Sequence, residues 1–118
     1  MKIRVEHSGR NLELDVKRVG FFSRGMGLMF KFRNTNNLLF EFEREVKIPF
    51  HSLFVFFPFL AIWLDSKNKV LEARIVKPFC FNVKPKTRFR KVIELPLNSK
   101  NAKIIEFFIR KNNLHDDF

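Results

Sequence analysis

The sequence predicts an all-β fold: a compact sandwich or barrel of jelly-roll type with one or two short helices. Three observations lead to this prediction. Short segments that alternate apolar and polar residues are separated by turn signals, which is typical of sandwiches and barrels. The composition, with 17 Phe, one Trp and no Tyr, favours a bulky aromatic core that needs few hydrogen-bond partners. The longest apolar run, residues 53–64, is too short to span a membrane and is interrupted by Pro58.

The N-terminal part predicts a hairpin followed by a third strand. Residues 2–7 (KIRVEH) and 11–17 (NLELDVK) alternate apolar and charged side chains, and Ser8-Gly9 between them is a turn signal. Residues 23–30 (SRGMGLMF) begin with a candidate helix N-cap, but two glycines would keep any helix there short. After an asparagine-rich turn, residues 38–45 (LLFEFERE) alternate again and predict a strand.

The apolar run 53–64 (LFVFFPFLAIWL) holds twelve residues, whereas a spanning helix needs about 20. Pro58 would remove a helical hydrogen bond, and Phe, Val, Ile and Trp favour strands. We therefore expect two buried strands that meet at a bend, and no transmembrane segment. The residues expected to be largely buried are Phe40, Phe42, Phe54, Phe57, Ile62 and Leu64.

The C-terminal half predicts a second hairpin, one more strand and a helix. Residues 65–69 (DSKNK) form a polar turn between 61–64 (AIWL) and 70–76 (VLEARIV), and 91–96 (KVIELP) form a strand. Residues 101–112 (NAKIIEFFIRKN) have helical spacing. The apolar face of this helix consists of Ile104, Ile105, Phe108 and Ile109. Because no repeat, linker or composition boundary interrupts the 118 residues, we expect one domain, 1–118.

Four motifs in order resemble those of a known family. Residues 23–31 (SRGMGLMFK) resemble ERxxGLMFR, and 37–42 (NLLFEF) resemble GMLFxF. Residues 51–65 (HSLFVFFPFLAIWLD) resemble HMLFMRFPIDVVFLD, and 92–96 (VIELP) resemble VLELP. Over roughly residues 15–97 the chain is thus similar to the small prokaryotic proteins grouped as domain of unknown function 192. The resemblance implies a soluble, β-rich sandwich or jelly roll, and the family has no established activity to transfer.

Several polar positions of the family motifs differ in this chain. Ser23 replaces a Glu, Phe56 replaces a basic residue and Leu60 replaces an acid, while the family's C-terminal Gly-Asp is not recognisable. If these positions form a site in relatives, that site is degraded here.

Positive charge is the strongest functional signal. The net charge is +11, from 23 Lys and Arg against 12 Asp and Glu, which is typical of proteins that bind nucleic acid or another anionic partner, and also of Lys-rich proteomes. No acidic residue occurs between Ala73 and Ile93. The candidate nucleic-acid-binding residues are Lys84, Lys86, Arg88, Phe89, Arg90 and Lys91, with the cations on phosphates and the ring stacked on a base. The alternative is a solvated segment whose charges protect an edge strand from aggregation.

A second hypothesis is a small-ligand or protein-binding domain with an apolar cleft near the GLMF turn, lined by Arg24, Met29 and His51. Structural roles compete with it. Arg24 can form a salt bridge with a carboxylate of strand 38–45, and a hydrogen-bonded His51 can open a strand without binding a ligand.

No catalytic or metal-binding constellation is recognisable. The three histidines and Cys80 lack zinc-ligand spacing, and no phosphate loop, dinucleotide fingerprint or nucleophile elbow is present. We expect no metal, no cofactor and a non-enzymatic binding or structural module. The single Cys80 forbids an intrachain disulfide and is expected to be a small buried residue between Phe79 and Phe81. The opening MKIRVEH lacks the apolar core of a signal peptide, which together with the lone cysteine predicts a cytoplasmic location.

Overall fold

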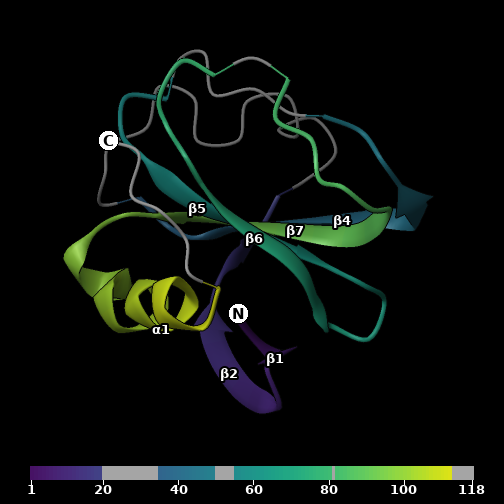
Figure 1. The fold of residues 1–118 in the computed structure, drawn as a ribbon, viewed down its shortest axis with the longest axis horizontal. Coiled ribbons are helices and arrows are strands. Elements are labelled where there is room, and N and C mark those ends of the chain that lie inside the picture. Colours follow the sequence, from purple (N-terminus) through teal and green to yellow (C-terminus); the bar gives the residue numbers. More distant parts are fainter. Residues whose placement is uncertain (20–34, 50–54, 81, 113–118) are drawn as a thin grey trace.

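A computed structural model of the protein describes residues 1–19, 35–49, 55–80 and 82–112 (Figure 1). It confirms the all-β class. The strands are β1 (Lys2–His7), β2 (Arg10–Asp15), β3 (Lys17–Arg18), β4 (Leu38–Val46), β5 (Phe59–Leu64), β6 (Val70–Val76) and β7 (Phe89–Pro96). A single turn of 3-10 helix, η2 (Ser99–Asn101), leads into the short helix α1 (Ala102–Asn112).

The described strands form two sheets. β1 and β2 are an antiparallel hairpin, and the other five strands lie in the order β3-β4-β7-β5-β6. β3 pairs with β4 in parallel, and the remaining neighbours are antiparallel. Figure 1 shows the hairpin and α1 on one side of the larger sheet. The jelly-roll arrangement of the prediction is not confirmed by this strand order.

The first hairpin has a two-residue turn. Ser8 and Gly9 have positive φ angles, 52° and 77°, as a type I′ turn requires. The register opposes Ile3 to Leu14, and both side chains are buried against the larger sheet. The predicted alternation with one wet face is therefore confirmed.

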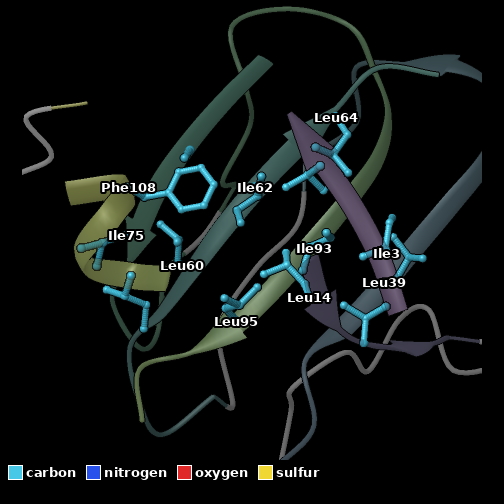
Figure 2. Packing of buried hydrophobic residues seen from close by; sticks show 14 residues of the cluster. Ile3, Leu14, Leu39, Leu60, Ile62, Leu64, Ile75, Ile93, Leu95 and Phe108 are labelled. Carbon is cyan, nitrogen blue, oxygen red and sulfur yellow. The ribbon is translucent and has the colours of Figure 1, made fainter. Parts of the chain in front are cut away.

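The first core lies between the larger sheet on one side and the hairpin and α1 on the other (Figure 2). Phe108 of α1 is fully buried and points at this sheet face. The sheet residues labelled in Figure 2 are Leu39, Leu60, Ile62, Leu64, Ile75, Ile93 and Leu95, and the hairpin contributes Ile3 and Leu14. The amphipathic helix predicted at 101–112 is confirmed, because its apolar face is the one that packs here.

The second core covers the opposite face of the same sheet and is rich in aromatic rings. Its largest side chains are Phe40, Phe57, Phe59, Trp63 and Phe89. Alternate residues of β5 point into each core, so all six of its side chains are buried. This double burial is the reason for the continuous apolar sequence FLAIWL. The segment is a strand of the protein core and not a membrane-spanning helix.

One detail of the predicted run 53–64 needs correction. Residues 55–58 are not a strand, so among the described residues only the part after Pro58, β5, pairs in the sheet. Pro58 ends the irregular stretch, and its carbonyl accepts a hydrogen bond from Leu97 N at 3.1 Å. Phe42, in β4, is half-buried and packs against the second core. Phe54 lies outside the described residues.

No helix within the described ranges has the length and apolar character needed to cross a membrane.

Candidate anion-binding surface

The connection between β6 and β7 is held to the sheet by one carboxylate. Glu72 Oε1 accepts a hydrogen bond from Lys86 N at 2.9 Å, and Oε2 forms an ion pair with Arg74. The Arg74 guanidinium in turn donates to Lys84 O at 3.1 Å and lies 5.3 Å from the centroid of the Trp63 ring. These charge-assisted contacts position the backbone of residues 84–88, which we call the basic loop.

Side chains of residues 83–86 alternate between the core and solvent, and the end of the basic loop is exposed. Val83 and Pro85 are buried, whereas Lys84, Lys86 and Arg88 are exposed. Within the described part of the chain, no ion pair involves the side chains of these three cations. The loop therefore presents three cations outward from an anchored backbone.

The other three predicted residues act within the fold. Phe89 is 2% exposed, and its ring contacts Phe42 edge-on with centroids 5.7 Å apart, so it is a core residue without a face for a base. Arg90 Nε donates to Phe42 O. Lys91 Nζ donates to Asn68 Oδ1 at 2.6 Å and lies 3.9 Å from Glu41 Oε2. The segment 84–91 thus divides into an exposed part and an internally bonded part.

A buried carboxyl that the sequence reasoning did not single out lies on the second face of the sheet. Glu94 of β7 is 6% exposed and is paired in register with Leu38 and Ala61, both members of the second core. Burial raises the pKa of Glu94 to about 8, so the carboxyl is mostly protonated at neutral pH. The sequence signal that could have indicated a buried carboxyl is an acidic residue among the apolar residues of the strand KVIELP.

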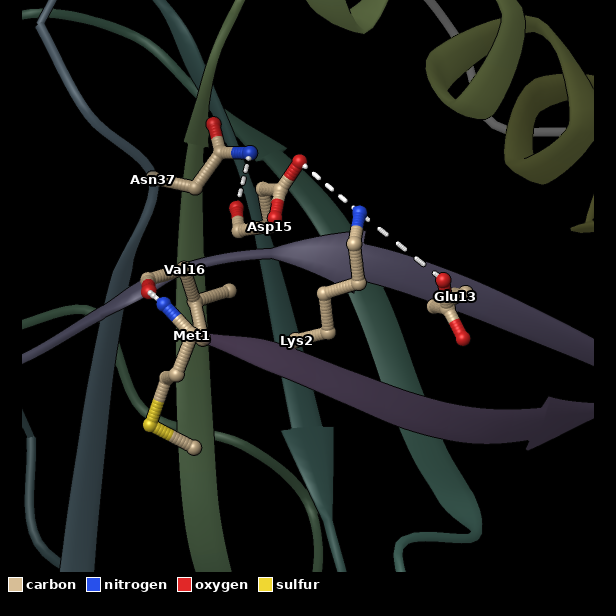
Figure 3. Close-up of polar contacts among 6 residues, drawn as sticks. All are labelled: Met1, Lys2, Glu13, Asp15, Val16 and Asn37. Atoms are coloured by element: carbon tan, nitrogen blue, oxygen red, sulfur yellow. Dashed lines mark hydrogen bonds and ion pairs between the residues drawn. The ribbon is translucent and has the colours of Figure 1, made fainter.

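A cleft of about 670 Å³, lined by both polar and apolar groups, opens beside the first strands and the start of α1. Figure 3 shows Lys2 Nζ between Asp15 Oδ2 at 3.2 Å and Glu13 Oε1 at 3.8 Å. Asn37 Nδ2 donates to Asp15 O at 2.8 Å. The lining residues are Met1, Glu13, Asp15, Val16, Lys17, Arg18, Asn36, Asn37, Lys100, Asn101 and Ile104.

Asn101 forms the buried wall of this cleft. Its Nδ2 donates to Asn37 Oδ1 and to Pro96 O, both at 2.8 Å, and its main-chain N donates to Asn98 Oδ1 at 3.2 Å. These bonds join η2, which leads into α1, to the end of β7 and to the segment before β4. Because many polar groups of the cleft bind one another in this way, their clearest role is structural.

The predicted apolar cleft cannot be placed, since Arg24, Met29 and His51 lie outside the described residues. Cys80 packs against the second core with Sγ 4.0 Å from Pro78 O, but it is half-buried and therefore less enclosed than predicted. Within the described ranges, no group of three His, Cys, Asp or Glu side chains is arranged to hold a metal.

The model of the DUF192 family, described as "Uncharacterized ACR", matches residues 3–106. This chain belongs to the DUF192 family. One relative, UPF0127 protein PH1112 from Pyrococcus horikoshii, is 32% identical over 88 residues, which cover 74% of this chain and 76% of that protein. The match agrees with the motifs quoted above.

Two solved structures are similar in fold to this DUF192 member. The first, a candidate transcription regulator from Sinorhizobium meliloti 1021, has a TM-score of 0.69 at 20% identity, over 87% of this chain and 82% of that one. The second, a protein of unknown function from Novosphingobium aromaticivorans DSM 12444, has a TM-score of 0.66 at 14% identity, over 87% and 76%. At these identities the likeness establishes a shared fold and no shared activity.

Proposed function

We propose that this DUF192 protein is a non-enzymatic module that binds nucleic acid through the basic loop. The observation that carries the proposal is the outward presentation of Lys84, Lys86 and Arg88 from a backbone held by Glu72 and Arg74. A positioned row of cations meets phosphates at a smaller entropic cost than flexible side chains on a mobile loop.

The charge distribution supports an anionic partner. Several described carboxylates are already paired with nearby cations: Glu13 and Asp15 with Lys2, Glu41 with Arg18, and Glu106 with Arg110. No acid lies between Ala73 and Ile93 to offset the basic loop, and the whole chain carries +11. The resulting positive potential would draw a polyanion to this side of the molecule.

Two further points agree with the proposal. A fold relative from Sinorhizobium meliloti is described as a candidate transcription regulator, a role that involves nucleic acid. Cys80 is the only cysteine of the sequence, so no intrachain disulfide can form, which suits the cytoplasmic setting we propose for such a module. The competing role for the basic loop is to keep the neighbouring edge strand β6 from pairing with other chains.

The proposal is tested by exchanging the three loop cations for Gln and titrating single-stranded and duplex oligonucleotides. The wild type should lose affinity as salt rises, with a slope of log affinity against log salt of about −2.1 for a single strand and about −2.7 for a duplex, for three phosphate contacts. The triple variant should lose most of this affinity and its salt dependence.

The matched control replaces three exposed cations elsewhere, Arg4, Lys17 and Lys103, by Gln. It lowers the net charge equally but leaves the basic loop intact, so it should bind nearly as well as the wild type. Equal losses in both triple variants, or no binding by the wild type at about 50 mM salt, would refute the proposal.

A further inference from the structure

Two phenylalanine rings meet on the surface near the second core. Phe56 and Phe79 are each 57% exposed, and no other aromatic side chain among the described residues is exposed to this degree. Their rings contact one another with centroids 6.0 Å apart and an interplanar angle of 65°. We call them the aromatic pair. Large apolar side chains gathered on a surface mark a binding site more often than single ones do.

The backbone holds these rings outward. Phe56 is flanked by Val55 and Phe57, which are 3% and 2% exposed, so the chain is anchored on both sides of the exposed ring. Phe79 has φ of 62°, in the left-handed region that a bulky residue enters only at a cost in free energy. Such strain persists where surrounding contacts enforce it, and it concentrates at functional positions.

One ring of the aromatic pair, Phe79, belongs to the same acid-free segment as the basic loop. Phe79 follows the exposed Lys77 and precedes Lys84 by five positions, and the segment from Ala73 to Ile93 contains no carboxylate. A Phe ring offers an apolar face and no hydrogen bond, so it recognises a flat π-system without choosing among bases. Proteins commonly hold single strands with cations that contact the phosphates and exposed rings that stack on the bases.

We propose that the aromatic pair stacks on the bases of a single-stranded nucleic acid whose phosphates contact the basic loop. The inference rests on the proposed function and specifies that the nucleic acid bound is single-stranded. The bases of a duplex are stacked on one another inside the helix, so their faces are not accessible to the Phe rings. The bases of an unpaired strand are accessible for stacking. The stacking role assigned to Phe89 by the sequence thus passes to Phe56 and Phe79.

The test compares Phe79→Asn and Phe79→Trp with the wild type. Asn tolerates the left-handed backbone and removes the ring, and Trp keeps a larger ring. Phe79→Asn should weaken binding of a single-stranded oligonucleotide about 5- to 150-fold, with duplex binding and heparin binding unchanged. Phe79→Trp should bind the single strand at least as tightly as the wild type. Leu71→Asn, at an apolar side chain on β6 that is 40% exposed, is the matched control and should change none of these affinities.

The outcomes separate this inference from the proposed function. If the wild type binds neither single strand, duplex nor heparin, the proposed function fails first. If it binds all three through the basic loop and Phe79→Asn alters none of them, only the stacking inference fails. If light scattering instead finds the wild type dimeric and Phe79→Asn monomeric, the aromatic pair is a contact between copies of the chain, and the inference is overturned.

Discussion

At the scale of single residues, Glu94 makes stability depend on pH. Burial raises its pKa from 4.5 to about 8 in the folded state. Below about pH 4.5 both states hold the proton, so the carboxyl contributes no penalty. As pH rises from there to about 8, the unfolded state releases its proton while the folded state keeps it, and stability falls. Above pH 8 the loss is complete, on the order of a few kcal/mol.

Glu94→Gln removes this titration and keeps the shape of the side chain. We expect the free energy of unfolding, measured in urea at pH 5 and pH 9, to fall less with pH in the variant than in the wild type. The variant should be the more stable of the two at pH 9. Parallel pH profiles for the two proteins would show that Glu94 is stabilised as an anion by other groups.

Because the Phe89 ring is buried, its removal should affect stability and leave nucleic-acid binding unchanged. Phe89→Ala should lower the free energy of unfolding by about 3–5 kcal/mol, measured by urea denaturation. Well below the unfolding transition, the folded fraction should bind oligonucleotides with wild-type affinity. If the variant were as stable as the wild type and lost only single-strand binding, Phe89 would be a contact residue for nucleic acid and not a core residue.

At the scale of elements, the β1–β2 turn can be improved. Ser8 occupies a left-handed position, φ 52°, that Asn adopts more readily, and Asn-Gly is the preferred pair for a type I′ turn. We expect Ser8→Asn to raise the free energy of unfolding by roughly 0.5 kcal/mol. Gly9→Ala should lower it by about 1 kcal/mol, because an added Cβ meets no atom within 4 Å and only the backbone φ of 77° opposes it. If both variants match the wild type in thermal denaturation, the turn contributes no strain.

Elements were more predictable than their partners. Residues 2–7 and 70–76 were predicted as strands with the boundaries they have, because alternation and turn residues are local signals. The parallel pairing of Lys17 with Leu38 joins segments 21 positions apart and leaves no local pattern. The same limit applies to segment 84–91: its cations were recognisable, but nothing local tells whether a Phe between two arginines faces solvent or core.

At the scale of the whole molecule, β5 couples two cores that would otherwise be independent. Phe59, Ala61 and Trp63 point into the second core, while Leu60, Ile62 and Leu64 point into the first. Loss of either core would expose one full face of the central strand to water. Each large buried side chain contributes roughly 1.5–3 kcal/mol to the free energy of unfolding. Neither core should therefore remain folded once the other is lost. We therefore propose that the described fold unfolds as one cooperative unit.

This coupling is measurable because Trp63, the only tryptophan, is fully buried in the second core. Its fluorescence reports that core, and far-ultraviolet circular dichroism reports the strands and α1 together. We expect the two signals to change at the same urea concentration. Leu60→Ala in the first core and Phe59→Ala in the second should each lower both midpoints together, with a loss of about 2–5 kcal/mol. If Leu60→Ala moved the dichroism transition and left the Trp63 transition in place, the two faces would unfold separately. Each would then have to be stabilised by contacts that do not pass through β5.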